Sequence, residues 1–179
     1  MNTKDYVLIA VLTALLCVIA PLSIPLSGGV PISLASFMIM LIGILLKDVK
    51  ATLVVVLYIL LAIFGLPVLA GYLSGIERVF GITGGFIWGY IPLTFVCGLF
   101  SRLSINFDNK KRTVYLALGM LLGTIILYTI GLIWFINFTK LDLVYALSVC
   151  VLPFILGDII KIILVLIISP RLVKAIKDK

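Results

Sequence analysis

The sequence contains no histidine and only three cysteines, and both shortages narrow the possible chemistry. Without histidine, catalysis by an imidazole base is excluded. Cys17, Cys97 and Cys150 are far apart, each within an apolar segment, which argues against a metal cluster and a disulfide framework. We expect the three thiols to pack in the interior. The sequence also lacks the nucleotide-binding motif G-x-x-x-x-G-K-[ST], so any energy from ATP must come from another subunit.

Charged residues are scarce as well. They make up 12% of the 179 residues, against about 25% in a soluble domain. Apolar residues account for 64% of the chain and the mean hydropathy is +1.37. A soluble fold of this size cannot hide so many apolar side chains from water. The composition therefore excludes a water-soluble enzyme and a disordered chain, and predicts an all-α integral membrane protein with one domain over residues 1–179.

Six apolar segments have, or nearly have, the roughly 20 residues that a spanning helix needs. They cover residues 6–20, 32–46, 51–68, 83–103, 113–137 and 143–170. The first is interpreted as a span and not as a signal peptide, because no clear cleavage site follows it. The sequence thus predicts a bundle of six transmembrane helices.

The basic residues are distributed unevenly over the connections between these segments. With six spans and the N-terminus inside, two basic residues, Arg78 and Lys140, fall on the outer face. Eleven fall on the inner face: Lys4, Lys47, Lys50, Arg102, Lys110, Lys111, Arg112, Arg171, Lys174, Lys177 and Lys179. Cytoplasmic loops of membrane proteins carry such an excess of Lys and Arg. We therefore expect both termini in the cytoplasm, and interpret the net charge of +7 as a topology signal and not as a nucleic-acid site.

Two long connections, 21–31 and 70–82, are rich in Gly and nearly uncharged, the first also contains Pro21, Pro25 and Pro31, and both are expected outside. Their apolar character, with proline restricting the first, favours a role in covering a ligand over that of a flexible linker. The second ends in Gly81-Ile82-Thr83-Gly84-Gly85 at the start of the fourth span. Glycines permit close backbone approach and a helix N-terminus attracts anions, so this segment and the nearby Arg78 form a candidate anion site.

Two ionisable residues lie inside the last predicted span. Asp158 and Lys161 are three positions apart and share a helix face. Lys161 precedes Pro170 by about 13 Å of helix, which puts the pair near the middle of a bilayer core about 30 Å thick. Each charge costs about 2.5–3.5 kcal/mol to insert there, so the pair points to a function. A cyclic urea or amide, with N–H and C=O groups side by side, would suit both groups. A proton or Na⁺ relay through Asp158 is the alternative, and an ion pair without function is the third reading.

Other residues near this pair are candidates for shaping a cavity. Pro153 and Gly157 precede the pair and predict a kink that opens space beside it. The hydroxyl of Tyr128, deep in the fifth span, needs a partner. In the first span, Ala10 and Ala14 are small residues four positions apart, a spacing that lets two membrane helices pack closely.

Several motifs occur in a characteristic order along nearly the whole chain. They are Val30-Pro31-Ile32-Ser33-Leu34, Gly65-Leu66-Pro67-Val68-Leu69-Ala70-Gly71, Thr83-Gly84-Gly85-Phe86-Ile87-Trp88-Gly89-Tyr90, Tyr128 with Gly131 and Trp134, and Leu152-Pro153-Phe154 followed by Gly157-Asp158, Lys161 and Pro170-Arg171-Leu172. With these motifs the chain resembles the BioY family, the biotin-specific S components of energy-coupling factor (ECF) transporters. The resemblance implies a six-helix, multi-pass protein of a prokaryotic cell membrane that binds biotin and needs no cofactor of its own.

The resemblance also implies roles for particular residues. Asp158 and Lys161 would bind the ureido group of biotin near Tyr128, while Arg78, Thr83 and Gly84 would face its carboxylate. Ala10 and Ala14 would dock a transmembrane T component, which couples to two ATPase subunits. The chain departs from the family pattern at Ala35, where many members have Gln, at Ile82, where Pro is usual, and in the segment 72–78. The alternatives are an S component for another small vitamin, an ion-coupled carrier that uses Asp158, and a membrane enzyme or structural subunit.

Overall fold

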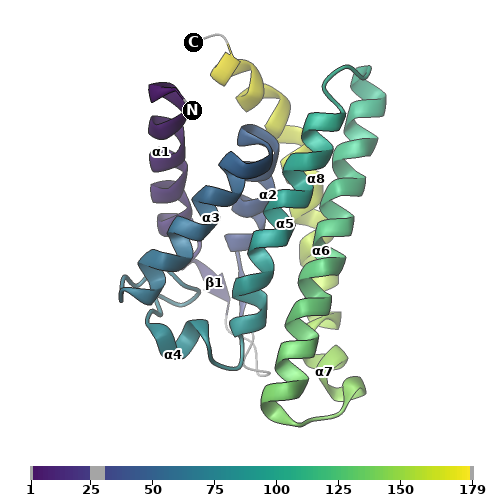
Figure 1. Cartoon of the computed structure of the whole chain (residues 1–179). Coiled ribbons are helices and arrows are strands. Elements are labelled where there is room, and N and C mark those ends of the chain that lie inside the picture. The colour runs from purple at the N-terminus through teal and green to yellow at the C-terminus, as the bar shows by residue number, and fades with distance from the viewer. Residues whose placement is uncertain (1, 25–30, 178–179) are drawn as a thin grey trace.

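A computed structural model describes residues 2–24 and 31–177 of the chain (Figure 1). The fold is helical apart from one short hairpin. In chain order its elements are α1 (Thr3–Ile19), β1 (Ser23–Ile24), β2 (Ile32–Ser33), α2 (Ala35–Leu46), α3 (Asp48–Ile63), α4 (Ile76–Val79), α5 (Gly84–Leu103), α6 (Asn109–Thr139), α7 (Leu143–Cys150) and α8 (Leu152–Lys177). The strands pair antiparallel, with Ser23 opposite Ser33.

Helix α2 is the centre of the bundle. Ten of its 12 residues are buried, and only Phe37 and Leu45 are partly exposed. It contacts α1, α3, α5 and α8, and in Figure 1 it lies behind α3 and α5. A helix that is apolar on all sides belongs in such a position. The outer surface of the bundle is also apolar: Val144 and Leu156, for example, are 74% and 71% exposed. An apolar exterior around an apolar core is the arrangement expected of a helix bundle in lipid.

Within the part of the chain that the structure describes, three stretches are long and apolar enough to cross a membrane. They are Gly84–Leu103, Asn109–Thr139 and Leu143–Ala175, and the shorter apolar helices are Ala35–Leu46 and Val49–Ile63. The predicted class, an all-helical membrane protein, is therefore confirmed, while six crossings remain a prediction. Predicted boundaries were wrong at several places, and α6 already begins at Asn109 while α8 continues past Pro170 to Lys177. Residues 32–33 pair in the hairpin, so α2 begins only at Ala35, and α3 ends at Ile63, just before Gly65 with φ 95°.

The last predicted span is not one continuous helix. It divides at Val151 (φ −125°, ψ −57°) into α7 and α8. Pro153 is the second residue of α8, where its missing N–H removes no helical hydrogen bond. The expected kink at Pro153 and Gly157 was therefore wrong in position, because the chain breaks before the proline and α8 continues through Gly157. On both sides of this break the chain stays against α6, since α7 and α8 both contact that helix.

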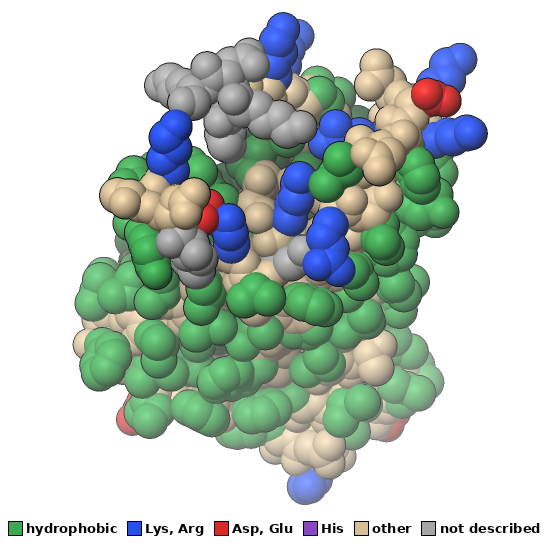
Figure 2. All heavy atoms as spheres, turned by 45° about the horizontal axis from the view of Figure 1, so that its top comes forward, with side chains coloured by type: hydrophobic (Ala, Val, Ile, Leu, Met, Phe, Trp, Pro, Cys, Tyr) green, Lys and Arg blue, Asp and Glu red, His purple; other side chains and the backbone are tan. Residues whose placement is uncertain are grey.

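The two ends of the described chain lie on the same side of the bundle. In Figure 1, α1 begins and α8 ends at one end of the molecule. Figure 2 shows most Lys and Arg side chains on that end, above a belt of hydrophobic side chains. Lys140 lies far from this group, at the C-cap of α6. Val30 and Lys179, as well as residues 25–29, lie outside the described residues.

Candidate ligand-binding site

A cavity with two adjoining compartments lies between the hairpin and helices α5, α6 and α8. Both compartments are bounded by Pro31, Ser33, Phe86 and Tyr90, so they share a wall. Their empty volumes, open mouths included, are about 600 and 410 Å³. Together their linings extend from Arg78 and Thr83 at one end to Asp158 and Lys161 on α8 at the other.

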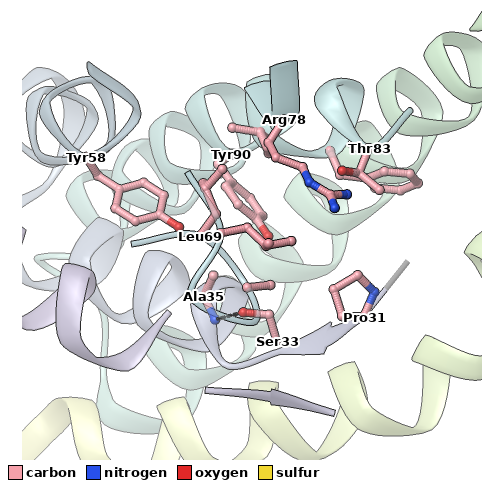
Figure 3. A pocket seen from close by; sticks show the side chains of 12 residues that line it. Pro31, Ser33, Ala35, Tyr58, Leu69, Arg78, Thr83 and Tyr90 are labelled. Carbon is pink, nitrogen blue, oxygen red and sulfur yellow. Dashed lines mark hydrogen bonds between the residues drawn. The ribbon is translucent and has the colours of Figure 1, made fainter. Parts of the chain in front are cut away.

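The outer compartment combines apolar walls with the guanidinium group of Arg78. Figure 3 shows Tyr58, Tyr90, Arg78 and Thr83 along one side and Pro31, Ser33 and Ala35 along the other. Arg78, on α4, directs its guanidinium toward the cavity beside Thr83. Within the described ranges 2–24 and 31–177, the Arg78 side chain has no hydrogen bond or ion pair. This compartment therefore presents positive charge to an incoming group.

Two other polar side chains of the outer compartment are already engaged. The Tyr58 hydroxyl donates to the carbonyl of Val68 at 3.0 Å. The Ser33 hydroxyl donates to the carbonyl of Ala20 at 2.7 Å and accepts the N–H of Ala35 at 3.0 Å. These bonds fix the walls: Tyr58 anchors the end of the α3–α4 connection, and Ser33 ties the hairpin to the end of α1.

The inner compartment ends in a buried polar cluster. Asp158 and Lys161 on α8 are only 6% and 7% exposed, and the Lys161 ammonium lies 3.0 Å from Asp158 Oδ1. The Tyr128 hydroxyl on α6 donates to the other carboxylate oxygen of Asp158. Lys161 also donates to the Ser36 hydroxyl on α2 at 2.9 Å. Three helices thus meet at one ion pair.

The cluster keeps hydrogen-bonding capacity after these contacts are made. A carboxylate offers about four acceptor positions and an ammonium three donors. In the described contacts, each oxygen of Asp158 accepts one hydrogen bond and Lys161 donates two. The remaining acceptors and donor can meet a ligand that carries N–H and C=O groups on adjacent atoms. Because the pair is shielded from water, such hydrogen bonds would be strong and selective.

The residues expected at the site fall into three groups. Asp158, Lys161 and Tyr128 line the inner compartment, and Arg78 and Thr83 line the outer one. Gly84 is buried behind the wall, where a Cβ would lie 2.5 Å from the Val79 carbonyl oxygen and 3.2 Å from the Trp134 ring, so its small size allows α4 and α6 to approach it. Trp134 Nε1 donates to the carbonyl of Gly81 at 2.9 Å and fixes the loop before Thr83.

Ala10 and Ala14 lie elsewhere, on the exposed face of α1. Among the cavity residues, sequence reasoning missed Ser36 and Tyr58. Ser36 is one of the few polar residues in the segment that forms α2, and that scarcity was a signal. Tyr58 carried no signal, because a tyrosine in an apolar run has many possible neighbours.

A helical membrane protein with a buried charged cluster at the end of a small-molecule cavity belongs to the class of membrane-embedded ligand-binding proteins. Three comparisons narrow this class. The family model described as "BioY family" matches residues 1–178. The chain is 34% identical over 177 residues to "Biotin transporter BioY2" of Lactococcus lactis subsp. cremoris, covering 98% of this chain and 94% of that protein. It is 38% identical over 164 residues to "Biotin transporter BioY" of Thermotoga maritima, covering 92% of each.

The fold agrees with these sequence matches. A crystal structure of "the S-component for biotin from an ECF-type ABC transporter" is similar with a TM-score of 0.85 and 30% sequence identity, over 97% of this chain and 95% of that one. The chain belongs to the BioY family. This is a family of transport proteins and not of enzymes.

Proposed function

We propose that the chain is the biotin-binding S component of an ECF-type transporter, which captures biotin from outside the cell and delivers it inward with an energy-coupling module. The observation that carries this proposal is the buried Asp158–Lys161 pair at the inner end of the cavity. The ureido group of biotin has two N–H donors and one carbonyl acceptor on a single ring. Asp158 accepts the N–H groups, and the free donor of Lys161 bonds the carbonyl.

The other end of the ligand would lie in the outer compartment. Biotin carries a carboxylate at the end of its aliphatic chain, and Arg78 and Thr83 line the outer compartment. Among residues 2–24 and 31–177, the guanidinium of Arg78 has no partner. The ureido group and the carboxylate would then occupy opposite ends of the cavity. Phe86 and Tyr90, which border both compartments, would contact the apolar middle of the ligand. Gly84 would contribute only through the backbone that orients Thr83.

The topology is part of the proposal. We infer one domain over residues 1–179 with six crossings, both termini in the cytoplasm, and a location in the plasma membrane of a prokaryote. The common end of α1 and α8 and the basic side chains gathered there support it. Arg78 would then lie at the outer face, where the ligand enters.

The partners follow from the same proposal. A transmembrane T component would pack against the face of α1 that carries Ala10 and Ala14, and two ATPase subunits would drive it. Both alanines are exposed, and the neighbouring Val7 and Val11 are 56% and 51% exposed, so a helix can approach closely there. A carrier that uses Asp158 as an ion relay is not favoured, since both carboxylate oxygens are held by Tyr128 and Lys161.

Titration of biotin into the purified protein in detergent, followed by calorimetry, tests the proposal. We expect saturable one-to-one binding that Asp158→Ala abolishes. Asp108→Ala is the control and should preserve binding, because Asp108 is exposed at the N-cap of α6. The milder Asp158→Asn would raise the Kd about 5- to 150-fold, the equivalent of about 1–3 kcal/mol for a lost charged acceptor. Absence of biotin binding by the folded wild-type protein would refute the proposal.

A further inference from the structure

A second cavity lies between α6 and α8, at the end of the bundle where both termini lie. Its lining includes Asn109, Arg112 and Thr113 from the first two turns of α6, and Leu166, Ser169 and Pro170 from α8. Its empty volume is about 690 Å³. The residues from each helix recur at intervals of three and four, so one face of α6 is opposite one face of α8. None of them borders the two compartments described above.

Ser169 is the unusual residue of this cavity. It is 1% exposed, and its hydroxyl has no hydrogen-bond partner among the described residues. Thr13, Thr94 and Thr124 all donate to the carbonyl four residues earlier, as hydroxyls in membrane helices commonly do. Ser169 makes no such bond. A buried hydroxyl without a partner destabilises the fold, unless a group from outside the chain supplies the partner.

The surroundings of Ser169 favour an anion. Arg112 is half-buried in the same cavity, and its guanidinium has no hydrogen bond or ion pair within the described part of the chain. The N-terminus of α6, a helix of 31 residues, adds a partial positive charge. Lys110 and Lys111 adjoin it, with Asp108 as the one acidic residue between positions 102 and 112. Charge at this end is therefore strongly positive, as the Lys and Arg side chains in Figure 2 show.

We propose that this cavity binds a phosphate group, held by the guanidinium of Arg112 and the hydroxyl of Ser169. Arginine matches phosphate with paired N–H donors, and a serine hydroxyl adds a third. Two sources share this chemistry: the headgroup of an anionic phospholipid and free inorganic phosphate. Basic pockets between membrane helices on the cytoplasmic side bind lipid headgroups elsewhere. A bound phosphate would join the ends of α6 and α8, which carry Tyr128 and the Asp158–Lys161 pair.

Native mass spectrometry of the delipidated full chain tests the proposal with three probes: dioleoyl phosphatidylglycerol, the matching dioleoylglycerol that lacks phosphate, and inorganic phosphate. We expect one retained phosphatidylglycerol, no retained dioleoylglycerol, and about tenfold weaker retention in Arg112→Gln. The matched control, Lys110→Gln, removes a neighbouring charge that does not line the cavity and should change retention less than twofold. Saturable binding of inorganic phosphate without lipid retention, lost in Arg112→Gln, would identify the free ion as the source.

Ser169→Ala separates a binding role from a structural one. Removal of an unpartnered buried hydroxyl should leave the thermal midpoint of the lipid-free protein unchanged or raised, while phosphatidylglycerol retention falls about threefold. Retention that is unchanged in Ser169→Ala would overturn the assignment of the hydroxyl. Equal retention of dioleoylglycerol, or equal losses in Arg112→Gln and Lys110→Gln, would overturn the phosphate site as a whole.

Discussion

Lys161 on α8 and Ser36 on α2 are joined by a hydrogen bond of 2.9 Å between residues 125 positions apart. The same ammonium is bonded to Asp158, which also accepts the Tyr128 hydroxyl from α6. The ion pair on α8 therefore connects that helix with the buried helix α2 and with α6. Ligand binding at this cluster is expected to stabilise the contact between α2, α6 and α8, because all three contribute to it.

The contact between Ser36 and Lys161 leads to the first prediction. Ser36→Ala removes one acceptor of the ammonium, so Lys161 is held less firmly toward the cavity. A net hydrogen bond contributes about 0.5–1.5 kcal/mol, which corresponds to a roughly 2- to 13-fold rise in the Kd for biotin. Calorimetric titration measures it. Ser148→Ala is the control, since the Ser148 hydroxyl is exposed on α7 and bonds only the Tyr145 carbonyl. A Kd in Ser36→Ala equal to that of the wild type would show that Ser36 does not position Lys161.

Arg78 gives a prediction that separates the two ends of the ligand. Arg78→Gln should weaken binding of biotin about tenfold, because the carboxylate loses a charged donor, and should barely affect biotinamide, which has no charge at that end. Competition between the two ligands measures the change in preference. Lys140→Gln is the matched control, because Lys140 is at the C-cap of α6 and does not line the cavity. If both ligands weaken equally in Arg78→Gln, the guanidinium does not pair with the carboxylate.

Much of the site was predictable because its central contact is local. Asp158 and Lys161 are three residues apart, and helix geometry alone puts them on one face. Their cost in a membrane points to function before any neighbour is known. The need of the Tyr128 hydroxyl for a partner was also evident, and Asp158 is that partner. Arg78 and Thr83 line the outer compartment, and the bond from Trp134 to Gly81 fixes the loop between them.

The parts that were missed depend on contacts between distant segments. Ser36 and Tyr58 reach the cavity only through the packing of α2 and α3 against α5, which no spacing in the sequence reveals. The break at Val151 was misplaced because Pro153 suits two structures, a kink within a helix or the first turn of a new one. The hairpin was missed because two paired residues per strand are too few for a pattern of alternation.

Gly131 supports the cavity wall, and its substitution should disturb both stability and binding. A Cβ built on Gly131 of α6 overlaps the ring of Phe86, which borders both compartments. Gly131→Ala must displace that ring, at a cost of about 1–3 kcal/mol of folding stability. Thermal unfolding in detergent should show a lower midpoint, and titration a weaker affinity for biotin. Gly157→Ala is the control, because no atom of the described residues beyond its own helical turn lies within 4 Å of its Cβ position and alanine favours a helix by about 0.5–1 kcal/mol. Equal midpoints for the two variants would contradict this account of Phe86.

The exposed face of α1 gives the last prediction. Ala10 and Ala14 point away from the cavity, so Ala10→Leu together with Ala14→Leu should leave the Kd for biotin within about twofold, since neither side chain touches the ligand site. The two larger side chains should prevent close approach of another helix and abolish co-purification with a T component. Thr129→Leu, on the exposed side of α6, adds a similar apolar bulk and should leave co-purification intact. If the α1 double variant still co-purifies as the wild type does, the T component docks on another face of the bundle.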